Sequence, residues 1–200
     1  MSPLTHFIGS WLVASVTTNN PRDRKLVTLA GVLPDLDGTG LVVDVARAVI
    51  TGQPFTNQFY AQYHHWLLHG WPGAIVLCGL LTCFARQRLR TAALCLLAFH
   101  LHLACDLVGS RGPASADLWP IAYGEPFFRH PFWLWRGQWR LDGWQNRSIT
   151  LVVFFTALWL ASRRGYSFVE VFSRKLDAIF VGVLRKWNAA LGRRFARKPG

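Results

Sequence analysis

Hydrophobic residues gather into continuous runs along this chain, separated by polar stretches. None of the runs alternates apolar and polar positions, so each one predicts a helix and not a strand. The runs extend over residues 7–16, 26–33, 41–50, 66–85, 91–108 and 149–161. Only 66–85 and 91–108 approach the roughly 20 residues that cross a hydrocarbon core. The pattern therefore predicts an all-α protein and leaves the number of membrane spans open.

The composition favours a membrane environment. Hydrophobic residues make up 52% of the 200 residues, and ten of them are tryptophan. A soluble domain of this size normally needs fewer apolar and aromatic side chains. We therefore expect a multi-pass helical bundle in the membrane. A soluble helical bundle is the alternative, because short apolar runs do not distinguish a buried core helix from a membrane helix.

The net charge of +12 is concentrated near the C-terminus, where residues 163–200 carry ten Lys and Arg against two acidic residues. This segregation argues against a nucleic-acid partner. Apolar residues of the tail recur at helical spacing and predict a basic amphipathic helix, either on an anionic membrane surface or docked on the protein. Its apolar face comprises Leu176, Ile179, Phe180, Val183, Leu184, Trp187 and Leu191. The chain thus divides into a helical membrane domain, 1–165, and a basic tail, 166–200.

Three basic clusters predict the orientation in an inner membrane. They lie at 22–25, 86–90 and 163–164, and the positive-inside rule places them, with the C-terminal tail, in the cytoplasm. The segment 109–148 then faces out. Its aromatic side chains either form an interfacial belt or cleft wall, or pack over the helix ends. They are Trp119, Phe127, Phe128, Phe132, Trp133, Trp135, Trp139 and Trp144.

The N-terminus and the cysteines suggest neither processing nor cross-linking. The first apolar run lacks the positive region and the cleavage pattern of a signal peptide, so we expect it to be retained. The cysteines lie inside apolar runs without CxxC spacing, which predicts buried free thiols. They are Cys78, Cys83, Cys95 and Cys105.

Six of the seven histidines lie in or beside three apolar runs. Ionisable groups at membrane depth are costly, so a functional site is the first interpretation. His65 with His69, and His102 with Asp106, are i, i+4 pairs that share a helical face, as two ligands of one metal require. In the expected topology all of these groups, together with His6, approach the outer side.

Imidazole and carboxylate are the usual ligands of a hydrolytic zinc ion. The predicted metal ligands are His6, Asp35, His64 or His65, His69, His102 and Asp106. Asp35 and Asp37 are also the candidates for a catalytic base. Their alternative role is helix capping around Pro34. His100 and His130 share no face with another ligand and are expected to be hydrogen-bonded core histidines.

Four motifs carry a resemblance to a known family. They are THFIGSW with His6, GVLPDLDG with Asp35 and Asp37, HHWLLHG with His64 and His69, and HLACDL with His102 and Asp106, followed by a glycine and Trp-Pro. In this order they resemble the YdjM-like family of membrane-bound, predicted metal-dependent hydrolases. The resemblance extends from residue 1 to about 120, and more weakly to 146.

The resemblance implies a distant similarity to zinc-dependent phospholipase C, and with it an all-helical fold, a zinc cluster of His and Asp, and hydrolysis of phosphoesters. The segment HHWLLHG departs from the family motif HRGxTHS by lacking the Arg-Gly pair and the threonine. The choice between His64 and His65 therefore stays open, as does the substrate preference.

These expectations together describe a metal-dependent hydrolase of the inner membrane. Its cofactor would be zinc or another divalent cation, and its substrate a phosphoester or related ester, including esters of membrane lipids. The alternative is a non-catalytic metal-binding membrane protein or a transporter component. An excess of ligands on one side, without a ladder of ligands through the bilayer, favours the enzyme.

Overall fold

The computed structural model describes residues 1–64, 68–128 and 132–196, and over these ranges the chain is helical apart from loops and two isolated β-bridges. The predicted all-α fold is confirmed. In chain order the elements are α1 (Pro3–Thr17), α2 (Pro21–Ala30), η1 (Leu33–Thr39), α3 (Gly40–Thr51), α4 (Gln58–Tyr63), α5 (Trp71–Cys83), α6 (Arg88–Gly109), α7 (Trp144–Arg164), η2 (Phe168–Val171) and α8 (Arg174–Ala196).

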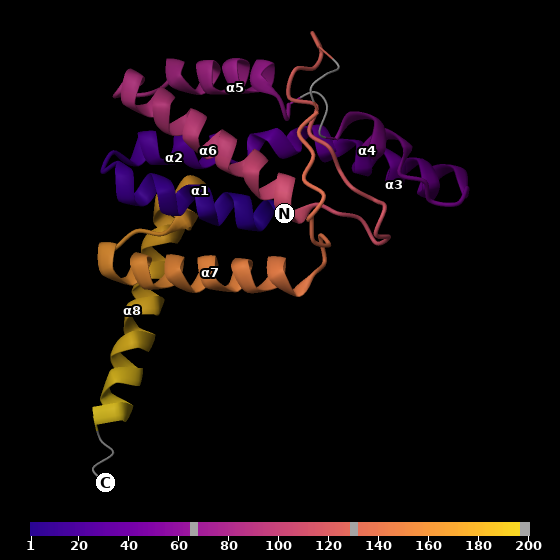
Figure 1. The fold of residues 1–200 in the computed structure, drawn as a ribbon. Helices are drawn as coiled ribbons and strands as arrows, with labels where there is room; N and C mark the ends of the chain where they lie inside the picture. Colours follow the sequence, from indigo (N-terminus) through magenta and orange to yellow (C-terminus); the bar gives the residue numbers. More distant parts are fainter. Residues whose placement is uncertain (65–67, 129–131, 197–200) are drawn as a thin grey trace.

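Five helices, α1, α2, α5, α6 and α7, run alongside one another and form the bundle (Figure 1). The starts of α1, α5 and α7 and the ends of α2 and α6 lie together, and we call this the site end. We call the opposite end, where α2 and α6 begin and α7 finishes, the basic end. Helices α3 and α4 project from the site end, while α8 leaves from the basic end.

Helix α5 corrects one expectation from the sequence. The apolar run 66–85 does not form one long helix, because α5 begins only at Trp71 and comprises 13 residues. Gly70 is extended and Pro72 occupies the first turn, where a proline starts a helix well and its missing N–H costs nothing. Residues 66 and 67 lie outside the described ranges.

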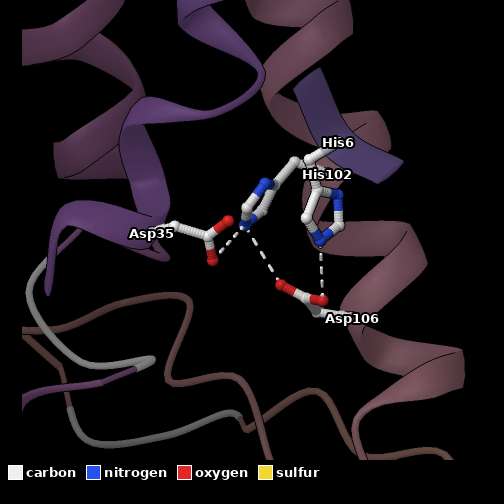
Figure 2. A group of neighbouring side chains, drawn as sticks. All are labelled: His6, Asp35, His102 and Asp106. Atoms are coloured by element: carbon white, nitrogen blue, oxygen red, sulfur yellow. Dashed lines mark hydrogen bonds and ion pairs between the residues drawn. The ribbon is translucent and has the colours of Figure 1, made fainter. Parts of the chain in front are cut away.

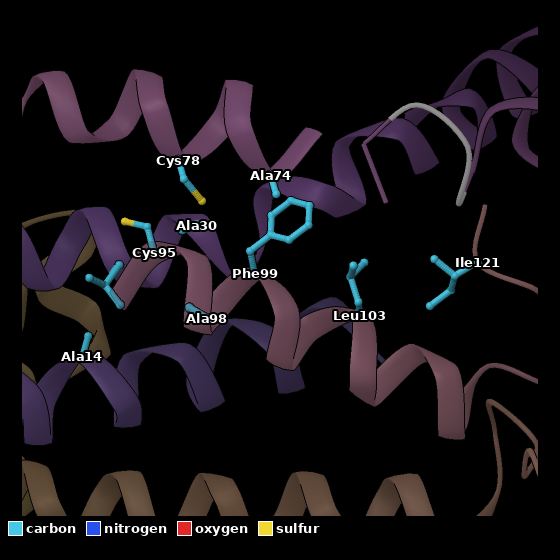
Figure 3. Packing of buried hydrophobic residues seen from close by; sticks show 10 residues of the cluster. Ala14, Ala30, Ala74, Cys78, Cys95, Ala98, Phe99, Leu103 and Ile121 are labelled. Carbon is cyan, nitrogen blue, oxygen red and sulfur yellow. The ribbon is translucent and has the colours of Figure 1, made fainter. Parts of the chain in front are cut away.

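The core of the bundle is built largely from small side chains, which let helix backbones approach closely. In this cluster Phe99 of α6 points toward Ala74 of α5, and Leu103, one turn further along α6, lies on the side of Ile121 (Figure 3). Cys78 and Cys95 are buried free thiols, as predicted, but Cys83 is exposed near the end of α5. The small buried residues of this cluster are Ala14, Ala30, Ala74, Cys78, Cys95 and Ala98.

Among the described helices, α6 is the one that is long and apolar enough by itself to cross a membrane. The pair formed by α2 and the segment 33–51, bent by 44°, passes the same test as a single broken span. By length and composition this gives one span or two. Large apolar side chains are nevertheless exposed along α5, α6 and α7. They include Ile75, Val76, Leu80, Leu97, Leu101, Leu151, Val152, Phe155 and Trp159.

Buried charges hold the basic end together. The Arg24 guanidinium donates two hydrogen bonds to the Glu170 carboxylate, at 2.7 and 2.6 Å, and lies 3.7 Å from the ring centroid of Tyr166. The Asp23 carboxylate accepts the backbone N–H groups of Arg86 and Gln87, at 2.8 and 3.1 Å. These contacts fasten η2 and the α5–α6 turn to the start of α2.

The loop 110–143 crosses the site end, and its aromatic residues divide between the two predicted roles. Trp133 stacks on Tyr123 with centroids 4.0 Å apart, inside the loop. Trp139 Nε1 donates to Asn146 Oδ1 in the first turn of α7 at 2.7 Å, and Phe127 stacks on Trp71 at the start of α5 with centroids 5.5 Å apart. Phe127 and Phe128 are nevertheless largely exposed, at 66% and 62%.

Candidate metal centre

Helix α6 supplies two groups of the site from its last turns. His102 and Asp106 lie one turn apart and are both buried, with His102 Nε2 3.0 Å from Asp106 Oδ2. His102 Nδ1 lies 3.0 Å from the carbonyl oxygen of Gly31. A carbonyl only accepts, so Nδ1 carries a proton, and Nε2 is the ring nitrogen directed at Asp106.

His6 and Asp35 reach the same point from other elements (Figure 2). His6, in the first turns of α1, places Nε2 3.1 Å from Asp106 Oδ1. Asp35, on η1, places Oδ1 3.7 Å from His102 Nε2. One ligand atom from each of these residues, His102 and Asp106 lies within 4.8 Å of all the others. The predicted convergence of these four residues is confirmed.

His69 joins this group from the turn before α5. Its Nε2 lies 3.1 Å from His102 Nε2 and 3.6 Å from Asp106 Oδ2, and the ring is fully buried. Its Nδ1 lies 2.8 Å from Asp37 Oδ2. Burial alone would lower the pKa of His69, but hydrogen bonding to Asp106 and Asp37 raises it to about 9. A carboxylate behind a histidine orients the ring and increases its basicity as a ligand.

Asp37 organises a second group with His64 and His69, whose ligand atoms also lie within 4.8 Å of one another. His64 Nδ1 lies 3.0 Å from Asp37 Oδ1, and the backbone N–H of Leu68 donates to Asp37 Oδ2 at 3.2 Å. The structure thus places His64 against Asp37 and not among the four converging residues. His65, the alternative ligand, lies outside the described ranges.

The capping role considered for Asp35 and Asp37 is not observed. Neither η1 nor α3 has a side-chain hydrogen bond at its N-cap. Asp35 Oδ2 is buried and has no hydrogen-bond partner within the described residues. A buried carboxylate oxygen without a donor is costly, and a cation beside it would remove that cost.

The spacing of the donor atoms fits a cation with short bonds. Two ligands at about 2.05 Å from a tetrahedral zinc ion are about 3.3 Å apart. The separations of His102 Nε2 from Asp106 Oδ2 and from His69 Nε2, 3.0 and 3.1 Å, are close to this value. The distances from His6 Nε2 to Asp106 Oδ1, 3.1 Å, and from His69 Nε2 to Asp106 Oδ2, 3.6 Å, are also close to this value. Imidazole nitrogens and carboxylate oxygens therefore stand where a divalent ion could be held.

Gly31 allows two of these elements to meet. A Cβ at this position would lie 1.8 Å from Ser10 Oγ and 2.6 Å from Ser10 Cβ, so a larger residue would force α1 and α2 apart. The Gly31 carbonyl is also the group that holds His102 Nδ1. A backbone position without a side chain thus sets both the helix spacing and the histidine tautomer.

A cavity of about 330 Å³ opens beside the converging ligands. Asp35, Asp106 and His64 contribute to its wall, together with the N-terminal residues and several apolar side chains. The N-terminal ammonium of Met1 contacts Asp106 Oδ1, and the Ser110 hydroxyl donates to the same oxygen at 3.2 Å. The remaining lining residues are Ser2, Pro3, Gly38, Leu41, Tyr60, Trp119 and Leu141.

Comparison with known families identifies the chain. The family model described as YdjM inner membrane protein matches residues 1–171. The chain belongs to this family. The matched region contains all of the converging residues and ends in η2, before α8. No curated protein and no solved structure matches the chain.

Sequence reasoning missed Tyr60 of this YdjM-family site, and it named Trp119 only among the aromatic residues of a belt or cleft wall. The Tyr60 ring stacks on His64 with centroids 4.5 Å apart, and Trp119 meets His64 edge to face at 5.6 Å. Burial, together with the carboxylates of Asp35, Asp106 and Asp37, raises the pKa of Tyr60 to about 12. The phenol therefore keeps its proton. The position of Tyr60 a turn before His64 was the available signal.

The histidines expected to stay outside the YdjM-family site divide as follows. His100 Nδ1 lies 2.8 Å from the Leu96 carbonyl oxygen and Nε2 lies 2.9 Å from the Tyr123 hydroxyl, which satisfies both ring nitrogens. His100 is therefore hydrogen-bonded away from the converging ligands, as predicted. His130 lies outside the described ranges.

Proposed function

We propose that this protein is a metal-dependent hydrolase of the inner membrane that cleaves a phosphoester or a related ester bond. The observation that carries the proposal is the convergence of imidazole nitrogens from α1, α6 and the turn before α5 on the carboxylates of Asp35 and Asp106, beside a cavity. Several buried carboxylates and imidazoles gathered at one place are costly, and a divalent cation among them would lower that cost.

The residues that would hold the ion are His6, His69, His102, Asp106 and Asp35. Mixed nitrogen and oxygen donors at these separations suit zinc. A divalent cation held there lowers the pKa of a water molecule and polarises the bond to be cleaved. Asp37 contacts His69 Nδ1 at 2.8 Å. We therefore propose that Asp37 orients the His69 ring, in place of the catalytic role expected from the sequence.

Two further residues complete the proposed chemistry. Asp35 has one oxygen toward His102 and a second, Oδ2, without a hydrogen-bond donor in the described structure, so it can take a proton from an attacking water. Tyr60 lines the cavity with a protonated phenol, which can donate to an oxygen of the substrate. General acid–base groups of this kind contribute about 10²–10⁴-fold in rate.

The cavity supports a substrate with an apolar part next to its phosphoester. Leu41, Leu141 and Trp119 line it together with the polar groups. A small polar ester would leave these side chains unused, whereas the glycerol and first acyl carbons of a lipid would cover them. We therefore propose a lipid phosphoester as the substrate class.

We propose a multi-pass arrangement in which the bundle axes cross the membrane. Large apolar side chains are exposed along both α5 and α7, Ile75 and Phe155 among them, and extended exposed apolar surfaces mark contacts with a membrane or a partner. The three basic clusters belong to the ends of the helices opposite the site. The positive-inside rule then places the basic end in the cytoplasm and the site end outside.

Metal analysis and a hydrolysis screen test the functional proposal. Purified protein should contain a stoichiometric divalent metal and should hydrolyse phospholipid or a soluble phosphodiester. His69→Ala and Asp106→Asn should each lose most of the metal and all hydrolysis. His100→Ala is the matched control, since it removes a histidine of the same bundle whose nitrogens bind elsewhere, and it should change neither.

The possible outcomes separate the enzyme from its rival. Stoichiometric metal without hydrolysis of any phosphoester or carboxylic ester would indicate a non-catalytic metal-binding protein. Hydrolysis that survives both ligand substitutions would refute the metal-dependent mechanism even if metal is present.

A further inference from the structure

Helix α8 has two apolar faces with different surroundings. One face docks on the protein, where Val181 is buried, Leu184 packs on the cluster around Trp11, and the Asp177 carboxylate accepts the Ser167 backbone N–H at 2.9 Å. The other face is uncovered. Its residues, with their exposed fractions, are Phe172 (75%), just before the helix, then Leu176 (58%), Ile179 (58%), Val183 (44%) and Trp187 (68%).

The uncovered residues follow one another at intervals of three or four positions, so they form a single stripe along the helix. At 100° per residue, Lys175 and Lys186 lie along one edge of this stripe. Arg185 lies on a different side, where its Nε donates to the Ser162 carbonyl at 2.9 Å. Lys175 and Lys186 therefore flank the stripe, whereas Arg185 contacts the end of α7.

The position of α8 matches a membrane surface. The helix starts at the basic end and extends away from the bundle across the direction of α1, α6 and α7 (Figure 1). If the bundle axes cross the bilayer, α8 runs along its cytoplasmic face. Between residues 163 and 190 the chain adds six basic residues against two acidic ones at this level, where anionic headgroups attract Lys and Arg.

We propose that α8 lies in the plane of the membrane, with Leu176, Ile179, Val183 and Trp187 inserted among the lipids and Lys175 and Lys186 bound to anionic phospholipid headgroups. The sequence alone placed Phe180 and Leu184 on the same apolar face, but in the structure both side chains pack against the protein. The inference rests on the membrane placement proposed above and is independent of hydrolysis.

Spin labels on the full-length protein in nanodiscs test this arrangement. Single cysteines at Ile179 and Val183 probe the stripe, and Ala178→Cys and Ala189→Cys probe an exposed side away from it. Cys83→Ser removes the exposed native thiol. In discs that contain phosphatidylglycerol, the ratio of oxygen to nickel-chelate accessibility should be several-fold higher at 179 and 183 than at 178 and 189.

Lipid charge and a lysine variant complete the test. In discs of phosphatidylcholine alone, or with Lys175→Gln and Lys186→Gln combined, the ratio at 179 and 183 should fall toward the value at 178. A low ratio at all four positions in anionic discs would overturn the proposal, because the stripe would then face water. Labels at 179 and 183 that neither reagent reaches would also overturn it and would indicate a second copy of the chain on the stripe.

Discussion

The two ends of the bundle both bury charged side chains, but they satisfy them differently. At the basic end each buried carboxylate meets a matching donor: Glu170 has the Arg24 guanidinium, and Asp23 has two backbone N–H groups. At the site end Asp106 and Asp37 face imidazoles, and Asp35 Oδ2 has no hydrogen-bond partner in the described ranges. Both carboxylates at the basic end are hydrogen-bonded, whereas Asp35 at the site end keeps one buried oxygen without a donor among the described residues.

This difference separates structural charge from functional charge. A buried ion pair with complete hydrogen bonding needs nothing further, so the Arg24–Glu170 contact serves to attach η2. The carboxylates and imidazoles of the site end converge where a divalent cation could be held. Substitutions at the two ends should therefore affect different measurements.

The largest expected loss of stability comes from Glu170→Gln. The Arg24 guanidinium would remain buried without its counter-charge, and breaking a buried pair in this way costs about 3–5 kcal/mol. Unfolding in a detergent titration measures the change. Arg140→Gln is the control, since the Arg140–Asp142 pair is 48% and 61% exposed and should be worth about 1 kcal/mol or less.

The same Glu170→Gln protein should keep its metal. Metal content per folded molecule should equal that of the unchanged protein, because no ligand contacts Glu170. Loss of metal in this variant would show that the two ends are coupled, and the distinction between them would fail.

A smaller effect is expected from Asp37→Asn. The amide keeps the size of the side chain but removes the negative charge behind His69, and second-sphere changes of this kind cost about 10–100-fold in metal affinity. Competition with a chelator measures the affinity. Unfolding free energy should change much less than for Glu170→Gln. Complete loss of metal would instead make Asp37 a direct ligand of an ion in the second group.

A further expected effect is a pH dependence of metal affinity. In the metal-free protein the pKa of His69 is raised to about 9, so below that pH a proton must leave before Nε2 can bind an ion. Affinity should therefore rise with pH by about tenfold per unit for this one proton and level off above about 9. Titration calorimetry in buffers of different ionisation enthalpy counts the released proton. A flat profile from pH 6.5 to 8.5 would contradict the His69 assignment.

Local sequence patterns predicted most of the helices and most of the side chains that converge at the site end. Apolar runs gave the positions of α1, α2, α3, α6 and α7, because burial requires apolar residues whatever the partner helix is. The i, i+4 spacing of His102 and Asp106 was sufficient to place them on one face. The length of α5 was misjudged because apolar content outweighed the starting signals at Gly70 and Pro72.

Contacts between distant segments decided the rest. The pairing of His64 with Asp37, the hold of the Gly31 carbonyl on His102, and the approach of Tyr60 and Trp119 to the cavity all join residues far apart in the chain. The split of α8 into a docked and an uncovered face has the same origin. The sequence by itself determined which groups are buried and charged, because that follows from residue type and helical period. Only the tertiary structure decided which of them meet, because hydrogen-bond partners are set by packing in space.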